Sequence, residues 1–114
     1  MVNNRFIVVL AIAVIGIMEF TIDQAEAQSK TISGDSYFGC VDRQYFNKLI
    51  RYAVQKDSQA FYGGLAAGAS SGTCTMFKAG EEVFIADTAI FSGLVKVRRR
   101  GEIAEYWTNI EAVR

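Results

Sequence analysis

The chain contains no histidine and no proline, only two cysteines and one tryptophan, and no excess of either charge. The absence of histidine excludes every mechanism that depends on imidazole, including Ser-His and Cys-His catalysis and histidine-ligated zinc. With 114 residues the chain has room for one small domain, and 51% hydrophobic residues are too many for a disordered protein. The sequence therefore predicts one small globular domain that has no histidine for catalysis or metal binding and no large net charge.

The first 27 residues follow the pattern of a secretory signal peptide. A short polar start precedes the apolar run 6–18, and residues 25–27 match the A-x-A cleavage pattern. This run is shorter than the ~20 residues that span a bilayer. We expect cleavage after Ala27, with a retained signal anchor as the alternative, because the segment 19–24 is long for the end of a signal peptide.

Cleavage leaves residues 28–114 as a single domain, periplasmic or secreted, without stable membrane insertion. It removes one basic and three acidic residues, so the net charge becomes about +2. Such a weak charge does not favour nucleic acid as a partner.

Both cysteines, Cys40 and Cys74, lie in the exported part, where an oxidising compartment favours a disulfide. Closing a loop of about 35 residues contributes roughly 3.5–4 kcal/mol in the chain-entropy model, a large share of the stability of so small a domain. The alternative is a pair of free thiols, but no C-x-x-C motif is present and two thiols without histidine make a poor metal site. We predict a structural disulfide, no metal and no cofactor.

The pattern of the exported part changes from helical to β along the chain. Residues 28–39 are polar and glycine-rich, which predicts a loose arm. Apolar residues then recur at helical spacing, which predicts a helical hairpin over about 42–67, with Asp42 and Asp57 as N-caps and Gly68 as the C-terminal stop. Residues 68–72 are expected to be a flexible linker.

From residue 73 to about 113, short strands alternate with glycine turns. The expected strands are 73–77, 82–88, 94–99 and 103–108. The predicted class is α+β: a helical hairpin packed on a small antiparallel barrel or curled sheet, joined by one disulfide.

The β part, about 73–113, resembles the bacterial SH3-like barrel modules. The resemblance rests on Gly80-x-x-Val83-x-Ile85, Gly93-x-Val95-x-Val97-Arg98, Gly101 and Tyr106-Trp107. It implies an SH3-like barrel and, because many such modules bind cell-wall peptides or other proteins, a binding role. No site motif of that family carries over, and the helical hairpin is not part of its usual module.

The hairpin around Arg100-Gly101 carries the candidate site. If these two residues form the turn, Lys96 lies opposite Glu105 as an ion pair, and one face of the hairpin is core. The other face carries Leu94, Lys96, Arg98, Ile103 and Trp107. A half-exposed tryptophan beside arginine is typical of a protein-binding hot spot. The alternative is that the helical hairpin covers this face and buries Trp107.

Catalysis is not expected. Residues 68–72 match G-x-S-x-G, but the strand, the helix and the histidine of a nucleophile elbow are missing around it. The candidate acids sit at caps and turns, and a small domain without a deep cleft is a poor place to raise the pKa of a carboxyl group. They are Asp42, Asp57, Glu81, Glu82, Asp87, Glu102 and Glu105.

These observations favour a non-enzymatic exported binding module that engages a protein or a peptidoglycan component of the cell envelope. One alternative is a structural accessory subunit of an envelope or secretion complex. A small carboxylate-type hydrolase is the other.

Overall fold

The computed structural model describes residues 29–114 and contains two helices and a six-stranded antiparallel sheet, which confirms the prediction of an α+β fold. The predicted signal peptide lies outside the described residues. The helices are α2 (Arg43–Val54) and α3 (Ser58–Ser71). The strands are β1 (Ser29–Thr31), β2 (Phe38–Cys40), β3 (Cys74–Met76), β4 (Glu82–Ala89), β5 (Leu94–Arg99) and β6 (Glu105–Asn109), with short 3-10 turns at η1 (Ile90–Ser92) and η2 (Ile110–Ala112).

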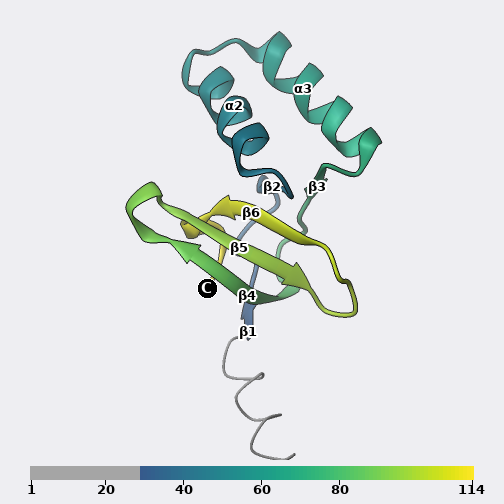
Figure 1. Cartoon of the computed structure of the whole chain (residues 1–114), viewed down its shortest axis with the longest axis vertical. Coiled ribbons are helices and arrows are strands. Elements are labelled where there is room, and N and C mark those ends of the chain that lie inside the picture. Colours follow the sequence, from purple (N-terminus) through teal and green to yellow (C-terminus); the bar gives the residue numbers. More distant parts are fainter. Residues whose placement is uncertain (1–28) are drawn as a thin grey trace, which may run out of the picture.

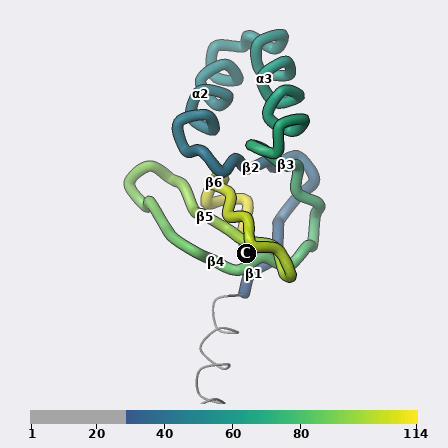
Figure 2. The backbone as a smooth tube through the Cα atoms, turned by 45° about the vertical axis from the view of Figure 1, so that its right-hand side comes forward, coloured from purple at the N-terminus to yellow at the C-terminus, as the bar shows by residue number. Residues whose placement is uncertain are grey.

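The sheet has the order β1-β4-β5-β6-β2-β3 and curls around its own inner face (Figure 1, Figure 2). After η2, Val113 forms a β-bridge with Ile32, and the backbones of Thr31 and Arg114 exchange two hydrogen bonds of 3.2 and 2.9 Å. The strand β1 is therefore paired with β4 and also bonded to the C-terminal residues. No helix within residues 29–114 is long and apolar enough to cross a membrane.

The expectation of a loose arm before Cys40 is wrong, because this segment contains β1 and β2. Each strand has only three residues, too few for an alternating pattern to be visible in the sequence. Their pairing comes from distant parts of the chain: β1 pairs with β4, and β2 pairs with β3 and β6.

The helices α2 and α3 begin at the predicted caps. The Asp42 carboxylate accepts hydrogen bonds from the backbone N–H groups of Gln44 and Tyr45, at 2.8 and 3.3 Å, and Asp57 accepts one from Ala60 at 3.1 Å. These bonds satisfy backbone donors of the first helical turns that have no partner inside the helix. Figure 1 shows the two helices side by side at one end of the sheet.

The predicted end of the second helix is wrong. The helix α3 continues past Gly68 to Ser71 and ends at Gly72, which takes the left-handed conformation with φ 80°. Residues 68–71 are therefore the last turn of a helix and not a flexible linker. Gly68 is glycine for a packing reason, because a Cβ atom there would lie 2.7 Å from the Cys74 Sγ atom.

The register of the β5–β6 hairpin differs from the prediction by two residues. Arg98 pairs with Glu105, and Lys96 pairs with Trp107, since residues 100–104 form a longer connection than a two-residue turn. A shift of two residues leaves every side chain on its predicted face, because side chains alternate with a period of two. The division of the hairpin into two faces therefore holds.

Two apolar clusters lie on opposite faces of the sheet. The helix-side core lies between the sheet and the helices, and the inner core lies inside the curl. The helix-side core consists of Phe38, Cys40, Phe46, Leu49, Cys74, Leu94 and Trp107. The inner core consists of Ile32, Phe77, Val83, Val95, Val97 and Tyr106. The strand β5 contributes to both clusters, because Leu94 points to one face and Val95 to the other.

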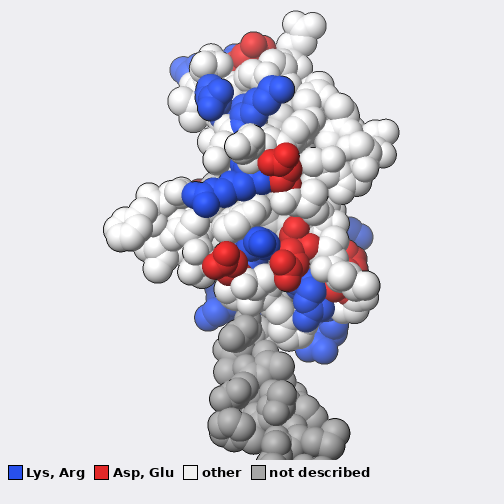
Figure 3. Space-filling model, in the orientation of Figure 1, with Lys and Arg blue, Asp and Glu red and all other residues white. Residues whose placement is uncertain are grey.

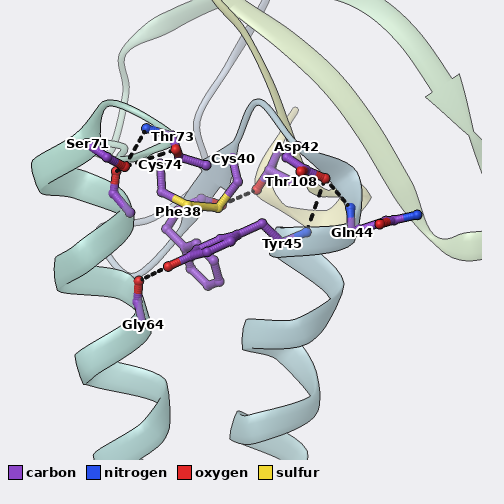
Figure 4. The surroundings of a disulfide bond; sticks show 11 residues. Phe38, Cys40, Asp42, Gln44, Tyr45, Gly64, Ser71, Thr73, Cys74 and Thr108 are labelled. Atoms are coloured by element: carbon purple, nitrogen blue, oxygen red, sulfur yellow. Dashed lines mark hydrogen bonds between the residues drawn. A yellow bond between two sulfur atoms is a disulfide. The ribbon is translucent and has the colours of Figure 1, made fainter.

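The predicted disulfide between Cys40 and Cys74 is confirmed. The two residues lie directly opposite each other on β2 and β3, with their Cα atoms 4.0 Å apart. Figure 4 shows the bond at the base of the two helices, beside Tyr45, whose hydroxyl donates to the Gly64 carbonyl at 2.6 Å. The chain leaves the sheet after β2, forms both helices and returns at β3, so the disulfide closes this excursion where it begins and ends.

Candidate interaction surface

The five residues predicted as a binding face differ widely in their solvent exposure. Trp107 and Leu94 belong to the helix-side core and are 9% and 4% exposed. Lys96 and Arg98 are half-buried, and Ile103 is 95% exposed in the connection that follows β5. The half-exposed position expected for Trp107 is therefore wrong, and the alternative in which the helices cover it holds. The apolar stripe of α2 supplies the cover, since Phe46 and Leu49 belong to the same cluster as Trp107.

Two cations stand over the indole ring of Trp107. The Lys96 Nζ atom and the Arg43 guanidinium carbon each lie 5.2 Å from the ring centre, within the range of cation–π attraction. Lys96 also forms the predicted ion pair with Glu105, at 3.7 Å between Nζ and Oε1. The tryptophan thus links Arg43, at the start of α2, to the sheet.

The arginine run 98–100 divides into two different environments. Arg99 ties β5 to β3 and to the turn before β4: its guanidinium donates to the Glu81 carboxylate at 2.5 Å, the Thr75 hydroxyl at 2.8 Å and the Met76 carbonyl at 2.5 Å. This half-buried arginine is structural.

Arg98 and Arg100 lie at the surface over one aromatic ring. The guanidinium carbons of both arginines lie 4.9 Å from the ring centre of Phe84. Arg100 also pairs with the Glu82 carboxylate, and Arg98 donates to the Glu102 carbonyl at 3.0 Å. Their charge is held on the sheet surface over Phe84.

The tip that joins β4 to β5 carries two adjacent apolar side chains that are exposed. Within η1, Ile90 is 70% exposed and Phe91 is fully exposed. Figure 3 shows this tip as an uncharged protrusion at the left of the molecule. Sequence reasoning missed it. The only available signal was an Ile-Phe pair that directly precedes the Ser-Gly turn at residues 92–93.

A cleft of about 420 Å³ separates this tip from the start of α2. The residues around it are Arg43, Thr88, Ala89, Ile90, Phe91 and Ser92. The Arg43 Nη2 atom donates a hydrogen bond to the Ser92 hydroxyl at 2.7 Å, which joins the two sides. We call the tip and this cleft together the tip cleft. It combines one cation, hydroxyl groups and a large apolar wall.

Five of the seven acidic residues that were candidates for catalysis have structural partners. Asp42 and Asp57 cap the helices, Glu81 and Glu82 pair with arginines, and Glu105 pairs with Lys96. Across residues 29–114, no group of three or more His, Cys, Asp or Glu residues is placed to hold a metal ion. Ser70, the serine at the nucleophile position of the G-x-S-x-G segment, lies in the last turn of α3.

Compared with models of protein families, with curated proteins and with solved structures, the chain matches none of them.

Proposed function

We propose that the chain is a non-enzymatic exported binding module that engages a protein or a cell-wall component through the tip cleft. The observation that carries the proposal is the position of Phe91, which is fully exposed beside a cleft of about 420 Å³. Aromatic side chains next to arginine are the groups that contribute most to binding at protein interfaces. The tip replaces the Trp107 face as the contact surface, since Trp107 and Leu94 are in the core.

The proposed location is the periplasm or the exterior of the cell. The Cys40–Cys74 disulfide supports it, because disulfides persist in oxidising compartments. The signal-peptide pattern of residues 1–27 supports it as well. Mass spectrometry of the exported protein checks the cleavage site, with a mature chain that begins near Gln28 as the expected result.

The proposed architecture is an SH3-like barrel with a packed helical hairpin inserted between β2 and β3. The closure of Val113 against Ile32 supports a barrel, and the shared helix-side core supports docking of the hairpin on it. In this arrangement the tip cleft lies between the barrel and the insertion.

Capture from envelope extracts tests the proposed function. The oxidised exported protein is immobilised and compared with the variants Phe91→Ser and Val54→Ser. Val54 is 76% exposed at the end of α2 and serves as the matched control, because it is also an exposed apolar residue. We expect Phe91→Ser to lose at least about tenfold in affinity for the captured protein or for purified peptidoglycan. Equal capture by all three proteins would reject the tip cleft as the contact surface.

A further inference from the structure

We propose that the tip cleft binds the C-terminal carboxylate of a polypeptide whose last side chain is large and apolar. This inference rests on the proposed function and names the ligand chemistry of the same site. It depends on the state of Arg43, on the composition of the opposite wall and on the size of the cleft.

Arg43 is a fixed cation with unused hydrogen-bonding capacity. Its guanidinium is held by the Trp107 ring at 5.2 Å and by the Ser92 hydroxyl at 2.7 Å from Nη2. No carboxylate of residues 29–114 lies within 4.0 Å of it. The nearby Asp42 side chain is engaged with the first amides of α2 (Figure 4). A guanidinium has five N–H donors in a planar fork, and a carboxylate matches that fork with two parallel hydrogen bonds.

The wall that faces Arg43 is apolar. Ala89, Ile90 and Phe91 form it, and the last two leave most of their surface in water. A ligand that places an apolar side chain on this wall removes that surface from water, which favours binding. A ligand that fits both Arg43 and the apolar wall therefore carries a carboxylate and an apolar group.

The size of the cleft selects how these two groups are connected. Arg43 and the apolar residues line the same open hollow of about 420 Å³, so a ligand that contacts both carries its two groups close together. The last residue of a polypeptide meets this requirement, because its carboxylate and its side chain share one Cα atom. The side-chain carboxylates of Asp and Glu lack an apolar group beyond the charge. One arginine also matches the single charge of a carboxylate better than the double charge of a phosphate monoester.

Short peptides test the inference directly, and the protein carries its own reporter. Trp107 is the only tryptophan, and it contacts Arg43, so a ligand on Arg43 should change its fluorescence. The exported, oxidised protein is titrated with N-acetyl-glycyl-glycyl-leucine and with the same peptide as a C-terminal carboxamide. We expect the carboxamide to bind at least about tenfold more weakly, because it lacks the charge that Arg43 pairs with.

Two variants locate the effect. Arg43→Gln should reduce the affinity for the free acid to that for the carboxamide. Arg51→Gln is the matched control, an exposed arginine on the same helix, and should leave both affinities unchanged. Thermal unfolding of both variants shows whether each has folded. If Arg43→Gln does not fold, the acid-to-carboxamide ratio of the unmodified protein decides the question alone.

Three outcomes would overturn the inference. Equal affinity for the acid and the carboxamide would show that the site does not recognise the carboxylate. The proposed function would still hold if capture depends on Phe91. Tighter binding of N-acetyl-D-alanyl-D-alanine than of the leucine peptide would show that the site does not select a large side chain. That result would assign the site to a cell-wall stem peptide. Dimerisation that Phe91→Ser abolishes assigns the tip cleft to a second copy of the chain.

Discussion

The structure gives the single tryptophan a different role from the one that its sequence neighbours suggest. In the sequence, Trp107 beside basic residues suggested a recognition face, whereas in the fold it fills the space between β6 and α2. The two cations that contact it, Arg43 and Lys96, lie over its ring. Exposure therefore distinguishes the two aromatic residues that matter here: Trp107 for stability and Phe91 for contact.

At the residue scale we predict opposite effects for these two side chains. Trp107→Ala should lower the free energy of unfolding by about 3–5 kcal/mol, because it leaves a cavity in the helix-side core. Phe91→Ser should change it by less than about 0.5 kcal/mol, since the ring makes no packed contact to lose. Urea denaturation of the oxidised protein measures both. A loss below about 1 kcal/mol for Trp107→Ala would show that the helices do not depend on this ring.

The faces of the hairpin could be predicted from sequence, but the exposure of its residues could not. Alternation assigned Lys96 and Trp107 to one face correctly, because an error of two residues preserves the face. Alternation cannot say what covers a face, and the cover comes from Phe46 and Leu49, far away in the chain. Phe91 was missed because an apolar residue in a turn has no periodic pattern to mark it.

At the scale of elements, α3 shows how tertiary contact can override a local stop signal. Gly68 has the properties of a helix C-terminus in the sequence, yet it lies inside the helix where α3 approaches Cys74 and Tyr45. Caps at Asp42 and Asp57 were predictable because the capping bonds are local. The close approach at Gly68 is not local, so the pattern could not reveal it.

We predict that two glycines of the same helix respond oppositely to alanine. Gly63→Ala should raise the melting temperature, because no atom lies within 4 Å of the added Cβ and alanine is favoured over glycine by up to about 1 kcal/mol. Gly68→Ala should lower the melting temperature, since the added Cβ would lie 2.7 Å from the Cys74 Sγ atom and 3.1 Å from the Tyr45 ring. Calorimetry of the pair checks this, and stabilisation by both substitutions would contradict the packing at Gly68.

At the scale of the whole molecule, the disulfide belongs to only one of the two cores. Cys40 and Cys74 are members of the helix-side core, and the inner core contains neither. The bond closes the excursion that holds α2 and α3, while β1, β4, β5 and β6 lie outside this loop. The helices therefore depend on the disulfide more than the sheet does.

Reduction should loosen the helices first. The chain-entropy model gives about 3–4 kcal/mol for a loop of this length, so amide protection in α2 and α3 should fall by roughly 10²-fold or more. Protection of the β5 amides should fall less. Hydrogen exchange with and without reductant measures both, and the Cys40→Ala/Cys74→Ala variant controls for effects of the reductant. A uniform loss of protection would mean that the chain unfolds as one cooperative unit.

The excursion between Cys40 and Cys74 also defines a cassette for protein engineering. Because the chain leaves and rejoins the sheet at Cα positions 4.0 Å apart, residues 41–73 could be exchanged for another module whose ends meet closely. Two side chains of the sheet, Leu94 and Trp107, would lose their cover in such a graft and would need polar replacements.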